Sequence, residues 1–174
     1  LKAEGYIPLA HGGQPWQDAT VFDAVALAEL GPDDYRKAFV DHDMDVINSA
    51  KMEEVFAQFA KVMSYVDDDA AGRDWNTATG MVIRGEAAMQ IMGDWAKGEF
   101  TAAGLTPGED YVCASAPGTT GQFTFNVDSF AMFTLSEEED IKAQKDLART
   151  ILEPEFQTLF NQNKGSIPVR TDMD

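Results

Sequence analysis

The sequence predicts an α/β fold in which helices alternate with short strands. The clearest helical signal lies in residues 52–66, where apolar residues recur at spacings of three and four. Ser49 precedes this stretch and suits an N-cap, and the apolar stripe is expected to face the core. The clearest strand signal is the mostly apolar run 87–92. Glycine and proline mark the connections, as is typical of alternating α and β elements.

The first fifty residues predict one strand and one helix. Residues 5–10 form the expected strand, which ends in the glycine-rich and tryptophan-containing loop 11–16. A helix is predicted over residues 18–30, and the Gly-Pro pair that follows is expected to end it. The acidic residues 41–45 are expected to form a linker to the next helix.

The middle of the chain predicts a helix over residues 76–85 and a buried strand over residues 87–92. A loop around Asp94 and a short helix follow. Another buried strand is predicted over residues 111–114, which contain the single cysteine, Cys113. No basic residue adjoins Cys113, so we expect a structural rather than a reactive thiol.

The last third predicts a long extended segment and two helices. Apolar and polar residues alternate over 123–133, which favours a strand with polar groups on one side. Ser136 and Glu139 have the spacing of a capping box, so a helix is expected to start there and to continue to about Leu152. A second helix is expected to end near Asn161.

Composition narrows the classes of function. The 174 residues contain 44% hydrophobic residues, enough for a sizeable core. Thirteen basic and thirty acidic residues give a formal charge of −17, which repels nucleic acids and anionic membranes. No apolar stretch approaches the roughly 20 residues needed to cross a bilayer. His11 and His42 lack the spacing of a metal site and are expected at the surface, so no metal or cofactor is expected.

Aromatic and polar residues occur together at the ends of the predicted elements rather than inside their apolar stripes. These positions are Trp16, Trp75, Trp95 with Asp94 and Lys97, and Asn126 with Asp128. An indole can stack on the apolar C–H face of a pyranose, while carboxylates and ammonium groups bind its hydroxyls. The set therefore indicates a sugar site. The structural alternative is that each tryptophan seals an edge of the core.

The same residues carry a resemblance to a known family, the extracellular solute-binding proteins of family 1, which are periplasmic or lipid-tethered receptors of ABC transporters. It extends over nearly the whole chain. The matching segments are 12–16 (Gly-Gly-Gln-Pro-Trp), 84–89 (Arg-Gly-Glu-Ala-Ala-Met), 93–95 (Gly-Asp-Trp) and 164–170 (Lys-Gly-Ser-Ile-Pro-Val-Arg). Within the family the chain most resembles the glucose and mannose receptors.

The resemblance implies a receptor with two lobes and a fold like that of type II periplasmic binding proteins. Residues 1–122 would form mainly the second lobe, 123–133 a strand crossing the hinge, and 134–174 helices that pack with the first lobe and start the next crossing. A large amino-terminal part with its export signal, and a carboxy-terminal portion, would lie outside this chain. The implied partners are a sugar, most simply a hexose such as glucose, galactose or mannose, and a membrane permease. The receptor would be a monomer without direct membrane insertion.

The resemblance also implies site residues. By their positions in the motifs, Trp75, Trp95, Asp128 and Lys164 resemble the sugar-contacting residues of the family. Asp94 and Trp16 are weaker matches, expected either to line the cleft or to support it. The structural alternatives are that Asp128 caps a strand edge and that Lys164 is a solvated surface charge.

Two other functions are compatible with parts of the sequence. A glycoside hydrolase would use two carboxylates, for which Asp94 and Asp128 are the candidates. No independent hydrolase motif accompanies them, so we expect a binding protein and not an enzyme. An acidic interaction module would explain the charge but not the three tryptophans with polar neighbours.

Overall fold

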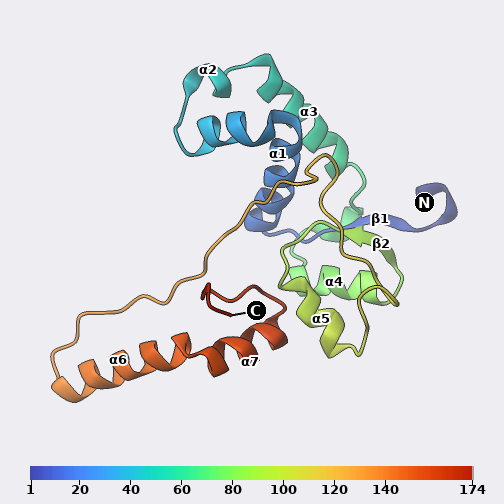
Figure 1. The fold of residues 1–174 in the computed structure, drawn as a ribbon. Helices are drawn as coiled ribbons and strands as arrows, with labels where there is room; N and C mark the ends of the chain where they lie inside the picture. The colour runs from blue at the N-terminus through green and yellow to red at the C-terminus, as the bar shows by residue number, and fades with distance from the viewer. Residues whose placement is uncertain (174) are drawn as a thin grey trace.

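The computed structural model describes residues 1–173 and confirms the α/β class (Figure 1). Its sheet consists of two parallel strands, β1 (Ile7–Ala10) and β2 (Ala87–Gln90), with Leu9 paired to Met89. Val66 adds a single parallel bridge to Leu9. Parallel neighbours require long crossover connections, and here the connection, residues 11–86, contains four α-helices.

The first helix is longer than predicted. α1 (Pro15–Phe39) starts three residues earlier and breaks at Gly31, whose φ of 75° and ψ of 169° are not helical. The predicted end at the Gly-Pro pair is therefore a break between two helical pieces. Pro32 can start the second piece because the first turn of a helix needs no partner for its N–H groups. The ammonium group of Lys51 donates to the Leu30 carbonyl at 2.7 Å and so binds an oxygen next to the break.

A second helix pair packs on α1. The short α2 (Met44–Ile47) occupies part of the stretch that was predicted to be a linker, and α3 (Ala50–Met63) follows it. The hydroxyl oxygen of Ser49 accepts a hydrogen bond from the Met52 backbone N–H at 3.2 Å, which confirms the predicted N-cap.

The apolar stripe of α3 is core only in part. Val55 is fully buried between α1 and α3, whereas the Phe56 side chain is 57% exposed. The expectation that the whole stripe is buried is thus wrong for Phe56. Its ring instead packs beside the ring of Phe22, with 5.3 Å between centroids, at the rim of the cluster.

The sheet and the next helices form a second cluster. α4 (Trp75–Ile83) packs on both strands through Ala78 and Met81, and α5 (Ala96–Ala102) follows β2. These elements were predicted. The expected burial of β2 holds for Ala87 but not for Met89, which lies on the same face of the strand and is 52% exposed.

Residues 111–114 do not form the predicted strand. Within residues 1–173 the only pairing there is one bridge between Tyr111 and Pro107, and Val112 and Cys113 are exposed. The prediction of a buried Cys113 is therefore wrong. The segment is held instead by Tyr111, whose ring stacks on Phe100 with 4.2 Å between centroids.

Residues 123–133 are extended, as predicted, but unpaired. Figure 1 shows this stretch running from beside α1 to α6 (Glu138–Leu152) without a neighbouring strand. An isolated extended chain gains no ladder hydrogen bonds, so the alternating pattern alone did not produce a strand. Its phenylalanines remain largely exposed, with Phe125 at 77%. The amide of Gln144 binds both the N–H and the carbonyl of Phe133, at 3.1 and 3.0 Å.

Two consecutive helices, α6 (Glu138–Leu152) and α7 (Pro154–Lys164), follow the extended stretch, and residues 165–173 come after them. The predicted capping box is absent: the N-cap of α6 is Glu137 and not Ser136, whose hydroxyl donates to the Glu137 carboxylate. α7 continues three residues beyond Asn161, and Gly165 then takes a left-handed conformation with φ of 82°. Asp174, the last residue of the expected segment 134–174, lies outside the described residues.

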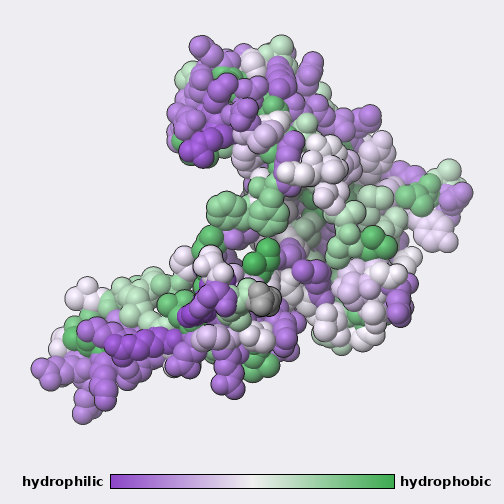
Figure 2. Space-filling model, viewed as in Figure 1, coloured by the Kyte–Doolittle hydropathy of each residue, from purple (hydrophilic) through white to green (hydrophobic). Residues whose placement is uncertain are grey.

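Short 3-10 turns, Lys2–Glu4 and Asp68–Ala70, complete the described elements. α7 packs against α5, which returns the end of the chain to the sheet region. Figure 2 shows a hollow between the α1–α3 part and the α6–α7 part, bordered by apolar side chains. Over residues 1–173, no helix has both the length and the apolar character that a membrane crossing requires.

Candidate functional site

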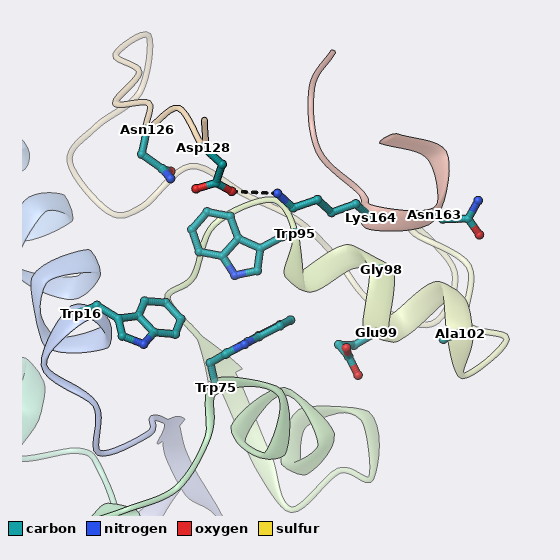
Figure 3. A pocket seen from close by; sticks show the side chains of 10 residues that line it. All are labelled: Trp16, Trp75, Trp95, Gly98, Glu99, Ala102, Asn126, Asp128, Asn163 and Lys164. Carbon is teal, nitrogen blue, oxygen red and sulfur yellow. Dashed lines mark hydrogen bonds and ion pairs between the residues drawn. The ribbon is translucent and has the colours of Figure 1, made fainter. Parts of the chain in front are cut away.

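A pocket of about 550 Å³, open to solvent, lies where α1, α4, α5 and α7 meet (Figure 3). Its size is within the range of small-molecule sites. The residues that line it are Trp16, Trp75, Trp95, Gly98, Glu99, Ala102, Asn126, Asp128, Asn163 and Lys164. Five of the six predicted site residues are thus brought together from positions up to 148 apart in the sequence (164 − 16).

All three tryptophans lie at the start of helices. Trp16 is in the first turn of α1, Trp75 is the first residue of α4, and Trp95 immediately precedes α5. α1 and α5 both follow strands whose carboxyl ends lie at one edge of the sheet, where α/β proteins place their ligands. Figure 3 shows the three indoles facing one space. The rings of Trp16 and Trp95 are 6.3 Å apart between centroids and inclined by 52°.

The backbone at Trp75 is fixed by two side chains. The Thr79 hydroxyl donates to the Trp75 carbonyl at 3.0 Å, and the amide of Gln90 donates to the same oxygen at 3.2 Å. The same Thr79 hydroxyl lies 2.8 Å from the side-chain oxygen of Gln90, so its one proton is shared between the two acceptors. Because Gln90 is the last residue of β2, these bonds connect the position of Trp75 to the sheet.

Glycines allow the close contacts around Trp95. A Cβ atom at Gly93 would lie 2.0 Å from the Trp95 ring, so the indole lies directly over this glycine. A Cβ atom at Gly98 would lie 2.8 Å from the backbone oxygens of Asn163 and Lys164. Both distances are shorter than ordinary contacts, and Gly98 therefore lets α5 approach the end of α7 and bring Lys164 to the pocket.

An ion pair borders the pocket beside Trp95. The ammonium nitrogen of Lys164 lies 2.9 Å from a carboxylate oxygen of Asp128, and it also lies 5.8 Å from the centre of the Phe160 ring. The side chain of Asp128 is 75% exposed and that of Lys164 35%. A solvated pair of this kind contributes only about 0–1 kcal/mol to stability. Its oxygens and N–H groups are accessible from the pocket (Figure 3).

Asp94 does not line the pocket, although it precedes Trp95. Its backbone oxygen accepts from the Lys97 N–H at 3.0 Å and is 3.0 Å from where a Cβ of Gly165 would lie. Among the described residues, the position of Asp94 agrees with a supporting rather than a lining role.

Asn126, which belongs to the aromatic and polar set named in the sequence analysis, lines the pocket together with Asp128, as alternation along an extended chain indicates for residues two apart. Other lining residues were not predicted as site residues. Glu99 follows Trp95 by four, the spacing of neighbours on one helix face. Asn163 and Ala102 carried no comparable signal in the sequence.

The loop after β1 is fixed by a buried polar group. His11 is 3% exposed and its Nε2 lies 2.8 Å from Asp18, so the expectation of a surface histidine is wrong for His11. The guanidinium of Arg73 donates to the His11 carbonyl at 2.9 Å and to Asp67 at 2.8 Å. The hydrogen bond from Arg73 lowers the pKa of Asp67. A Cβ at Gly13 would lie 2.3 Å from the Gly72 nitrogen, which explains the glycine there.

Comparison with known proteins gives consistent matches. Residues 1–157 match the family model of the bacterial extracellular solute-binding proteins. The chain is 56% identical over 173 residues to a "probable sugar-binding periplasmic protein" of Brucella suis, covering 99% of this chain and 41% of the relative. It is 54% identical over 173 residues to a protein of the same name from Rhizobium meliloti, with the same coverage of both chains. A xylose/arabinose-binding protein of Haloferax volcanii is 30% identical over 163 residues, which are 92% of this chain and 34% of the relative.

Proposed function

The chain belongs to the family of bacterial extracellular solute-binding proteins, and from this we propose that it is part of a sugar receptor that serves an ABC transporter. The chain spans about 41% of the length of the Brucella and Rhizobium relatives described above. We place residues 1–122 in the second lobe, 123–133 at the hinge crossing, and 134–174 against the first lobe. Sugar would then bind between the lobes.

The observation that carries this proposal is the combination of three indoles with a polar pair around one open pocket. A sugar ring has an apolar C–H face for Trp75 or Trp95, and stacking of this type adds roughly 0.5–1.5 kcal/mol beyond the burial of area. Its hydroxyls can donate to Asp128 and accept from Lys164. Hydrogen bonds that involve charged groups contribute about 1.5–3 kcal/mol each.

The proposed sugar is a hexose, with glucose, galactose and mannose as the first candidates. An epimer that turns one hydroxyl away would leave the Asp128 carboxylate without its partner in the closed site, and such unpaired groups give large selectivity. The relatives support sugar as the class, since their names include "sugar-binding" and "xylose/arabinose-binding". We therefore include pentoses in the test below.

The other parts of the proposal follow from the family and the relatives. We propose a periplasmic or lipid-tethered location, a membrane permease as the partner and a monomeric receptor. A relative from Pyrococcus horikoshii, 35% identical over 173 residues, is named as an ABC transporter extracellular-binding protein, which supports the transport role. Binding would shift the two lobes toward a closed form.

A hydrolase is the alternative, and the geometry disfavours it. Glycoside hydrolysis needs two carboxyl groups on either side of the scissile bond. Of the candidate pair, Asp128 lines the pocket and is bonded to Lys164, whereas Asp94 is not among the lining residues. The family is one of binding proteins, and we propose binding without turnover.

The test is a titration of the complete receptor with glucose, galactose, mannose, xylose and arabinose, in which tryptophan fluorescence reports binding. A saturable change for one sugar, with that sugar recovered unaltered, would support the proposal. Absence of a response to every sugar would refute the sugar as ligand, and consumption of the sugar would refute binding without turnover.

One substitution separates a ligand contact from a surface charge. Lys164→Met should weaken sugar binding about 10- to 100-fold, because it removes a charged donor. It should change the melting temperature little, because the ion pair is solvated. Lys142→Met on the exposed side of α6 is the matched control and should change neither quantity. Equal binding by both variants would return Lys164 to the surface-charge interpretation.

A further inference from the structure

We propose that Gln14 is the positioning residue that sets the orientation of Trp16 in the pocket and couples it to Trp75. The proposal rests on the proposed sugar site, since it names a residue that determines how well that site fits its ligand. Gln14 is not among the residues that line the pocket, so its effect would pass through the indole.

The amide of Gln14 makes three hydrogen bonds in two directions. Its oxygen accepts from the Trp16 indole N–H at 3.1 Å and from the Gln17 amide at 3.0 Å. Its nitrogen donates to a carboxylate oxygen of Asp74 at 3.2 Å. An indole only donates and a carboxylate only accepts, so these two partners permit just one orientation of the amide.

The position of the Gln14 oxygen does not depend on Trp16. Gln17 is fully buried, and its amide nitrogen donates both to Gln14 and to the Arg73 carbonyl, the latter at 3.3 Å. The Gln14 oxygen is therefore held from the interior of the protein. Trp16 is 41% exposed and its indole N–H donates to Gln14, whereas the Gln14 amide is also bonded to Gln17 and Asp74, so Gln14 is the more firmly held partner. The more firmly held group thus orients the other one.

The same amide connects two elements of the site. Asp74 is the N-cap of α4, and its side chain makes no capping bond within that helix. Its oxygen is thereby free to accept from Gln14, and the next residue in the chain is Trp75. Gln14 thus joins the start of α1 to the start of α4 across 60 positions in the sequence. The relative placement of the two indoles follows from this link.

The orientation of an indole matters for a sugar because stacking uses one face of the pyranose. Epimers differ in which hydroxyls project from that face, so a tilted ring favours one epimer over another. Loss of one net hydrogen bond corresponds to roughly a three- to tenfold change in an equilibrium. We expect Gln14→Met to weaken binding of the preferred sugar by about this factor. The difference in affinity between that sugar and its epimers should become smaller.

The experiment is a double-mutant cycle between Gln14 and Trp16 in the complete receptor. Gln14→Met removes all three bonds with similar side-chain volume, and Gln14→Asn retains the amide but shortens its reach. Each is combined with Trp16→Phe. Gln58→Met on α3 is the matched control, because within residues 1–173 its side chain makes no hydrogen bond and does not line the pocket.

Two readouts are taken. The first is sugar affinity, and the second is the near-ultraviolet circular dichroism that Trp16 contributes, obtained as the difference between each protein and its Trp16→Phe counterpart. We expect Gln14→Met to lower the sugar affinity of the receptor that retains Trp16, and to leave the sugar affinity of the Trp16→Phe receptor unchanged. We also expect the circular dichroism contribution of Trp16 to change in Gln14→Met and, to a smaller degree, in Gln14→Asn, but not in Gln58→Met.

Equal loss of affinity with and without Trp16 would overturn the proposal, because Gln14 would then act without the indole. An unchanged Trp16 spectrum in both Gln14 variants would also overturn it. If Gln14→Met fails to fold, the same two criteria apply to Gln14→Asn. Failure of the wild-type receptor to bind any sugar would refute the proposed function, while the spectral comparison would still decide whether Gln14 orients Trp16.

Discussion

Replacement of Gly98 by alanine should destabilise the protein, although helix propensity predicts the opposite. Gly98 lies within α5, where alanine is favoured over glycine by about 0.5–1 kcal/mol. The new Cβ would lie 2.8 Å from two backbone oxygens of α7, whereas ordinary contacts start at 3.4 Å. Backbone atoms cannot turn away as a side chain can, so α7 would have to shift.

The magnitude follows from these two opposing terms. Overpacking of this kind costs about 1–3 kcal/mol, which leaves a net loss of about 0–2.5 kcal/mol, with a central value of about 1 kcal/mol, after the gain in propensity. For a chain of this length, 1 kcal/mol corresponds to roughly 2–4 °C, so the melting temperature should fall by about 2–4 °C at the central value and by up to about 10 °C. Sugar affinity should fall as well, because Lys164 lies at the displaced end of α7.

Gly80→Ala is the matched control for this prediction. Gly80 is also inside a helix, α4, and the nearest atom to its new Cβ is the guanidinium nitrogen of Arg84 at 2.9 Å. That atom is the end of a flexible side chain and can move. Gly80→Ala should therefore raise the melting temperature by a few degrees, following propensity. Thermal unfolding by far-ultraviolet circular dichroism compares the two, and an equal rise for Gly98→Ala would refute the steric argument.

Three further predictions concern stability. Ser49→Ala should cost about 1 kcal/mol in the free energy of unfolding by urea, whereas Ser136→Ala should cost almost nothing, because only Ser49 caps a helix. The hydrogen bond from Arg73 lowers the pKa of Asp67. The stability that this bond gives the folded state is complete above the ordinary aspartate pKa and is lost as the pH falls through the lowered pKa. Asp67→Asn should therefore reduce the fall in melting temperature at acid pH, measured by thermal unfolding over a pH series. Burial raises the pKa of Tyr35 to about 12, so its contribution to stability is complete below the ordinary tyrosine pKa of 10 and is lost as the pH rises toward 12. In a titration with base followed by phenolate absorbance, Tyr35→Phe should lack the tyrosine that ionises last in the unsubstituted protein.

The sequence predicted those parts of the fold that depend on local patterns. The helix α3 and its N-cap at Ser49 depend on local signals, and both were found, although Phe56 of its apolar stripe is exposed. The strand over 111–114 and the strand over 123–133 were wrong, because a strand also requires a neighbour that the pattern of its own residues does not reveal. The capping box at Ser136 was wrong because α6 starts one residue later than that spacing requires, with Glu137 as its N-cap.

The candidate site was predictable because its tryptophans lie at the ends of predicted elements. Two of them, Trp16 and Trp95, follow β1 and β2, whose carboxyl ends lie at the same edge of the sheet. The pairing of Asp128 with Lys164, 36 positions apart, was not deduced from spacing, and only the resemblance to the family placed both in one site. The burial of His11 was missed because its partner Asp18 lies on the next helix. The roles of Gly93 and Gly98 could not be seen without the positions of the ring and of α7.

The extended stretch 123–133 also limits how α6 and α7 can move. It is anchored at its far end by Gln144, while Thr119, just before its start, is buried and Gly118 lies against Ala28 of α1. Eleven residues of extended chain reach at most about 36–40 Å, and this stretch is already extended. The segment therefore cannot lengthen much further. The two helices can turn about their contact with α5, but they cannot move far outward as a body, so the path open to them is a rotation.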